Sequence, residues 1–109
     1  HMRILKKGSN FKLKVYNSEK VSGHMPSIDV LFDSMAQEVG NKSIGVIMTG
    51  MGRDGAEGIL KIKKSGGHTI AQNEETSVVF GMNRVAVDLG GINEIVPLDE
   101  ITSRIIRKI

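Results

Sequence analysis

The sequence predicts an α/β fold, namely part of a doubly wound, mostly parallel, Rossmann-like sheet with a β-hairpin at its N-terminus. Residues 44–71 have the order strand, glycine loop, helix and strand, which is typical of a βαβ unit with a right-handed crossover. The chain offers only about three such strands, whereas sheets usually have about four to six. We therefore expect residues 1–109 to form a single partial domain.

A hairpin and a helix are predicted in the first forty residues. "FKLKV", residues 11–15, alternates apolar and polar positions, and the turn-rich "KKGSN" separates it from "RIL". Apolar residues recur at helical spacing from residue 27 to residue 39, with Ser27 as the expected N-cap. His1 and Met2 could be natural or a remnant of expression, so the fold prediction leaves them out.

Further short elements follow. "IGVIM", residues 44–48, is an apolar run without alternation, which favours a strand covered on both faces. The helix after the glycine loop ends at Gly66-Gly67, and the next strand contains "TIA". A short helix over residues 83–89, a strand in "EIVPL" and a last helix capped by Asp99 complete the prediction.

Composition limits the classes of function. A chain of 109 residues with 39% hydrophobic and 25% charged residues is typical of one folded globular domain. It has neither an apolar run long enough for a membrane span nor a secretory signal, so we expect a cytoplasmic protein without membrane insertion. The absence of cysteine excludes disulfides and thiolate chemistry. Its 15 basic residues are dispersed and its aromatic residues few, which argues against nucleic-acid binding.

The stretch "VIMTGMGRDGAEGIL", residues 46–60, contains Gly50-x-Gly52-x-x-Gly55 between a predicted strand and a predicted helix. In a dinucleotide-binding domain such glycines let the backbone approach a pyrophosphate. That pattern also requires an acid at the end of the second strand, where this chain has Gln72-Asn73. The carboxylate of Asp54 would moreover repel a phosphate, so dinucleotide binding is retained only as an alternative.

Asp54 has two other interpretations. With Glu57 it has the spacing of a capping box, a cap worth about 1 kcal/mol. It could instead orient the histidine of a hydrolytic triad, because chemistry in open parallel sheets gathers at the carboxyl ends of the strands. Backbone N–H groups of the same turn, such as that of Met51, would then face a developing oxyanion. Because Asn caps helices about as well as Asp, Asp54→Asn should spare stability and remove only triad activity.

Three segments, "TGMGRDGAEG", "TIAQNEETSVVFGM" and "PSIDVLF", resemble the C-terminal part of the catalytic domain of CheB-type methylesterases of bacterial chemotaxis. The resemblance implies hydrolysis of glutamyl methyl esters, and deamidation of glutamines, on methyl-accepting receptors by a Ser–His–Asp triad. It identifies Asp54 as the triad acid and Gly50, Met51 and Gly52 as the oxyanion and active-site loop. It implies no cofactor and no metal, and full-length members usually carry an N-terminal receiver domain.

Other parts of the family pattern are missing from this sequence. Neither the turn that carries the nucleophilic serine nor the segment that carries the catalytic histidine is found, so the chain alone is expected to be inactive. His24 in "GHMPS" is interpreted as a loop residue, and His1, His24 and His68 lack the spacing of metal ligands. A non-catalytic alternative is a fragment that forms homo-oligomers through an exposed sheet edge.

Overall fold

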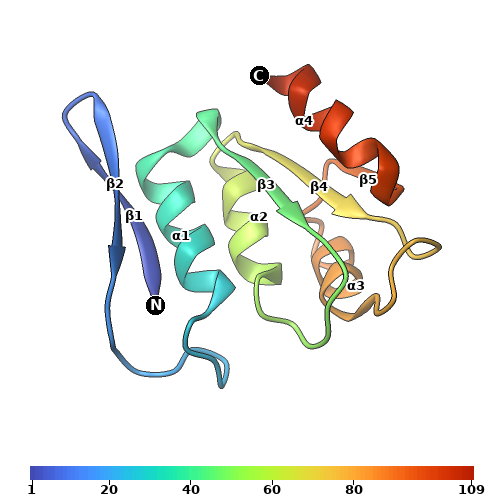
Figure 1. The fold of residues 1–109 in the computed structure, drawn as a ribbon, viewed down its shortest axis with the longest axis horizontal. Coiled ribbons are helices and arrows are strands. Elements are labelled where there is room, and N and C mark those ends of the chain that lie inside the picture. Colours follow the sequence, from blue (N-terminus) through green and yellow to red (C-terminus); the bar gives the residue numbers. More distant parts are fainter.

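The structure is a computed structural model that describes residues 1–109, and it contains two separate sheets (Figure 1). The N-terminal sheet is an antiparallel hairpin of β1 (Met2–Lys7) and β2 (Asn10–Val15). The second sheet is parallel, in the order β3 (Ile44–Ile47), β4 (His68–Gln72) and β5 (Glu94–Val96). The predicted α/β class, with its N-terminal hairpin and parallel sheet, is confirmed.

Helices cover both faces of the parallel sheet. Helices α2 and α3 pack on one face and α4 on the other, while α1 lies between α2 and the hairpin (Figure 1). No helix has the length and apolar character that crossing a membrane requires. The helices are α1 (Ile28–Glu38), α2 (Ala56–Lys64), α3 (Gly81–Asp88) and α4 (Ile101–Lys108), with 3-10 turns at Gly40–Lys42 and Leu98–Glu100.

Two hydrophobic clusters form the core, one on each face of the parallel sheet. Successive residues of a strand point to opposite faces, so the neighbours Ile70 and Ala71 of β4 belong to different clusters. Ala71 lies with residues of α2 and α3, whereas Ile70 packs with Ile101 of α4. Burial on both faces explains why β3 and β4 are apolar runs without alternation.

Three element ends differ in detail from the prediction. His1 is buried and Met2 begins β1, where it pairs with Val15, so both residues belong to the fold. Asp99 does not cap the last helix, because it lies within the 3-10 turn that precedes α4. Ser27 does occupy the N-cap position of α1, but its hydroxyl makes no bond to that helix.

Candidate functional site

The loop that carries the glycines joins the carboxyl end of β3 to α2. Its backbone is fixed to the segment that enters α3. The Gly50 N–H donates to the Val79 carbonyl at 2.9 Å, and the Gly50 carbonyl accepts from the N–H groups of Gly81 and Met82, both at 3.0 Å. The loop therefore has a defined position at the rim of the sheet.

Asp54 is the buried acid of this loop, with 6% of its surface exposed. Its Oδ1 accepts the Ser27 hydroxyl at 2.7 Å and the Asp29 N–H at 3.1 Å. Its Oδ2 accepts the Ile28 N–H at 2.7 Å. The two N–H groups are the first of α1 and have no partner within that helix. Asp54 thus caps α1, a helix that begins 26 residues earlier in the sequence.

The capping box predicted for Asp54 and Glu57 is wrong. Gly55 occupies the N-cap position of α2 with a φ of 97°, a left-handed conformation that suits glycine, and no side chain of the loop caps that helix. A Cβ at this position would also lie 2.9 Å from the side chain of Ile28. Glu57 faces solvent and pairs with Arg53 at 3.4 Å. The Asp54 carboxylate instead accepts hydrogen bonds from the free N–H groups of α1.

Hydrogen bonds keep Asp54 ionised despite its burial. Burial alone would raise its pKa, but the donors of Ser27, Ile28 and Asp29, together with the nearby His24, outweigh this effect and lower the pKa. A carboxylate has about four acceptor positions, of which the chain fills three. The remaining position, on Oδ2, has no donor within the chain.

The residues predicted for the oxyanion lie in the same loop as Asp54. Met51 exposes 80% of its surface, and its backbone N–H donates to no acceptor within the chain. The N–H of Gly52 is likewise free, whereas Gly50 is held by its bonds to the entry of α3. Free, rigidly held N–H groups are the donors that an oxyanion site requires.

Comparison with known proteins identifies the family. The sequence model of the CheB methylesterase family matches residues 1–105. This chain belongs to the CheB methylesterase family. The protein-glutamate methylesterase/protein-glutamine glutaminase of Sulfurimonas denitrificans is 50% identical over 105 residues, and that of Yersinia pestis is 44% identical over 109. These matches cover 96% and 100% of the chain but only 30% and 31% of the relatives, so the chain spans less than a third of their length.

A solved structure agrees with the assignment. The crystal structure of the Thermotoga maritima CheB methylesterase catalytic domain superposes with a TM-score of 0.96 and 32% sequence identity. The superposition covers 100% of this chain and 58% of the other. The CheB match begins at residue 1, in agreement with the place of His1 and Met2 in the fold.

The glycine loop of this CheB chain is unsuited to a dinucleotide. A bound pyrophosphate would need the N–H groups at the start of α2, but Asp29 already occupies two of them, since its Oδ1 accepts from Gly55 at 3.0 Å and Gly58 at 2.8 Å. At the end of β4, where an acid would hold the ribose, Gln72 instead accepts the Thr49 N–H at 3.0 Å. The dinucleotide alternative therefore fails at both points.

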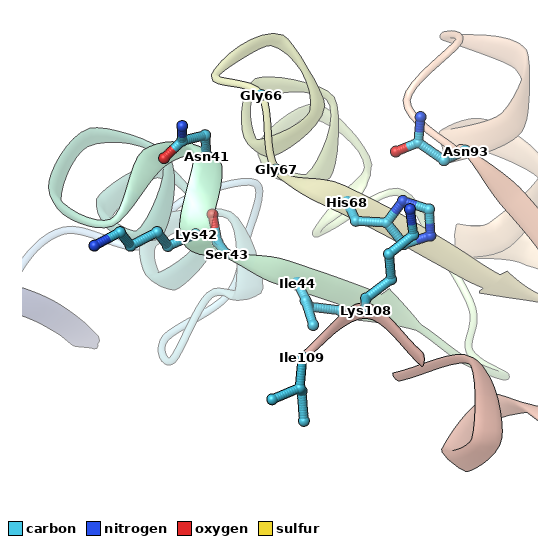
Figure 2. Close-up of a pocket in the computed structure, with 10 residues that line it drawn as sticks. All are labelled: Asn41, Lys42, Ser43, Ile44, Gly66, Gly67, His68, Asn93, Lys108 and Ile109. Atoms are coloured by element: carbon cyan, nitrogen blue, oxygen red, sulfur yellow. The ribbon is translucent and has the colours of Figure 1, made fainter. Parts of the chain in front are cut away.

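The largest cavity of the CheB chain lies elsewhere. It has a volume of about 470 Å³ and opens at the amino ends of β3 and β4, next to Ile44 and His68 (Figure 2). His68 and Lys108 both line it, while the side chain of Lys42 points away from them. No residue of the Asp54 loop lines it. Because chemistry in parallel sheets gathers at the opposite ends of the strands, the cavity is not the hydrolytic site.

Sequence reasoning missed Asp29 and His1 as neighbours of the site. Asp29 is buried against the start of α2, and His1 Nδ1 accepts the Ser27 N–H at 3.2 Å. No local pattern indicated either contact, because each partner is more than 20 residues away in the chain. Gly58 was a usable signal, since a glycine inside a helical pattern indicates close approach of another element.

Proposed function

We propose that this chain is the C-terminal part of the catalytic domain of a protein-glutamate methylesterase and supplies the acid of its Ser–His–Asp triad. One observation carries the proposal. Asp54 is a buried, ionised carboxylate at the carboxyl end of a parallel strand, with one acceptor position left after it has capped α1. The names of the relatives support the reaction class.

In the complete enzyme the triad serine attacks the ester carbonyl while the triad histidine accepts its proton. Asp54 accepts the other imidazole N–H, which fixes the tautomer of the ring and stabilises the imidazolium. Collapse of the tetrahedral intermediate releases methanol, and water then hydrolyses the acyl-enzyme to a glutamate side chain. With a glutamine substrate, the same sequence releases ammonia. No step requires a metal or a cofactor.

The Asp54 loop also supplies the oxyanion donors in this proposal. The free N–H of Met51 is the principal donor, with the N–H of Gly52 beside it. The bonds of Gly50 to Val79, Gly81 and Met82 hold these donors in place before substrate arrives. Because the backbone donates, the exposed Met51 side chain is free to contact the receptor substrate.

The serine and the histidine belong, in this proposal, to the part of the catalytic domain that precedes this chain. An N-terminal receiver domain regulates the enzyme in a two-component pathway, and methyl-accepting receptors in the cytoplasm are its substrates. Self-association of the isolated chain remains an alternative prediction, because β3 is the edge of the three-stranded sheet. Sedimentation of the isolated chain as a monomer at high concentration would contradict it.

The test uses the complete enzyme and measures methanol released from a methylated receptor. Asp54→Asn should lower turnover on the order of 10⁴-fold, because the histidine then adopts the wrong tautomer. The isolated chain should release no methanol above background. Activity of Asp54→Asn within tenfold of wild type would contradict the triad assignment.

A further inference from the structure

Asp29 caps α2 although it belongs to α1. It exposes 8% of its surface and lies in the first turn of α1, facing the neighbouring helix. Its Oδ1 accepts the Gly55 N–H at 3.0 Å and the Gly58 N–H at 2.8 Å. These donors stand at the start of α2, where N–H groups have no partner within the helix. Asp29 therefore does for α2 what Asp54 does for α1.

The two caps are reciprocal. Asp54, which precedes α2, accepts the first N–H groups of α1 and the hydroxyl of Ser27. Asp29, which belongs to α1, accepts two N–H groups at the start of α2 and donates its own N–H to Asp54 at 3.1 Å. We call these two carboxylates and their five hydrogen bonds the carboxylate clasp. Through the clasp, the side chain of Asp54 is bonded to α1 and not to α2, the helix that follows its loop.

Close packing leaves the clasp little freedom. A Cβ on Gly58 would lie 2.6 Å from the Cβ of Phe32 and 2.9 Å from Asp29 Oδ1, so only glycine lets α1 and α2 approach this closely. The Asp29 carboxylate is held between these backbones. Any loss of its acceptor oxygen frees the N–H groups of Gly55 and Gly58, one residue and four residues after Asp54.

We propose that Asp29 is a positioning residue for ester hydrolysis, which fixes the Asp54 loop through the carboxylate clasp and adds a second negative charge beside Asp54. The inference rests on the proposed function of Asp54. Two carboxylates side by side stabilise an imidazolium more than one does, because the attraction between opposite charges adds. The basicity of the triad histidine then depends on both.

The charges that act on Asp29 include those of Asp54 and Asp33, and a substitution of Asp33 serves as a control. Burial raises the pKa of Asp29, as do the charges of Asp54 and Asp33, while the bonds from Gly58 and Gly55 act in the opposite direction. Asp33 lies one turn further along α1, and it pairs with Lys61 of α2 at 3.2 Å. The charge of His24, in the loop that precedes α1, acts on Asp54 and lowers the pKa of that carboxyl. Asp33→Asn is therefore a matched control that removes the same charge from α1 without touching the loop.

The experiment compares Asp29→Asn, Asp29→Ala and Asp33→Asn in the complete enzyme. Asp29→Asn keeps the acceptor oxygen and loses the charge, so the acid limb of kcat/KM against pH should move to lower pH by about 0.3–1 unit. Asp29→Ala loses the oxygen as well and should lower kcat about 10–100-fold with little change in KM, because the loop shifts. Asn at this position should restore most of that loss, and Asp33→Asn should leave both readouts near wild type.

Results that oppose the inference are distinct from those that oppose the triad. An unmoved acid limb in Asp29→Asn would make Asp29 a structural cap only, and so would a wild-type kcat for folded Asp29→Ala. If Asp29→Ala does not fold, the acid limb of Asp29→Asn still decides. Asp54→Asn is measured in parallel. If it is inactive while the Asp29 variants have wild-type pH profiles, the triad stands and the inference falls; if it is active, the triad assignment and the inference fall together.

Discussion

Asp54→Asn in the complete enzyme tests the geometry of the site in two ways, through stability and through turnover. The sequence alone predicts that Asn would cap as well as Asp and leave stability unchanged. The structure predicts otherwise, because both carboxylate oxygens accept backbone N–H groups of α1, one from Ile28 and one from Asp29. An amide has a single acceptor oxygen. In either orientation, its NH₂ group faces one of these two donors.

The magnitude follows from the bonds that are lost. Losing a hydrogen bond to a charged acceptor and leaving its donor buried lowers the free energy of unfolding by about 1.5–3 kcal/mol. Loss of the negative charge at the start of α1 removes roughly 0.3–1 kcal/mol more. The sum, about 2–4 kcal/mol, corresponds to a decrease in Tm of roughly 4–16 °C for a domain of about 150–250 residues.

Ser27→Ala provides the control for stability. It removes one donor to Asp54 Oδ1 but keeps both backbone bonds and the charge, so a loss of about 1–2 kcal/mol is expected with turnover within a few-fold of wild type. Unfolding in urea gives the free energies, and methanol release is measured well below every Tm. A Tm of Asp54→Asn within about 1 °C of wild type would refute the bonding of both Asp54 oxygens to α1. A loss of turnover no larger than that of Ser27→Ala would refute the catalytic role.

Three further predictions concern stability. The pKa of Asp54 is lower in the folded protein than in the unfolded chain, so its ionised carboxylate stabilises the fold at every pH above the ordinary pKa of an aspartate. That stabilisation is lost as the pH falls through the lowered folded pKa. The free energy of unfolding should therefore fall less steeply with decreasing pH in Asp54→Asn than in wild type. Gly58→Ala brings a Cβ against Phe32 and should reduce the free energy of unfolding by about 1–3 kcal/mol, whereas the exposed Glu57→Ala should change it by less than about 0.5 kcal/mol. His1→Ala removes the acceptor of the buried Ser27 N–H and should reduce the free energy of unfolding by about 1–3 kcal/mol, measured by urea unfolding.

The elements of the fold could be predicted because their patterns are local. The alternation in "FKLKV" and the apolar run "IGVIM" are patterns of neighbouring residues, and both segments form the expected strands, although every residue of β2 is exposed. The helix caps could not be predicted, because the N–H groups of two different helices can bind the same carboxylate. Asp54 has the local spacing to cap α2, the helix that follows it, yet its carboxylate accepts the free N–H groups of α1. Gly58, four residues after Asp54, indicates only that some element lies close to α2, and it does not identify that element as the start of α1.

The glycine loop also could not be interpreted from its local sequence alone, and in this case the uncertainty concerned the function. Gly50-x-Gly52-x-x-Gly55 indicates that some group approaches the backbone at the start of α2, but the pattern does not identify the group. In a dinucleotide domain the approaching group is a phosphate. Here it is the carboxylate of Asp29, carried by a neighbouring helix, and its charge excludes the phosphate from the same N–H groups. The neighbouring carboxylates, and not the glycines, therefore decide against a nucleotide here, because they occupy N–H groups that a phosphate would need.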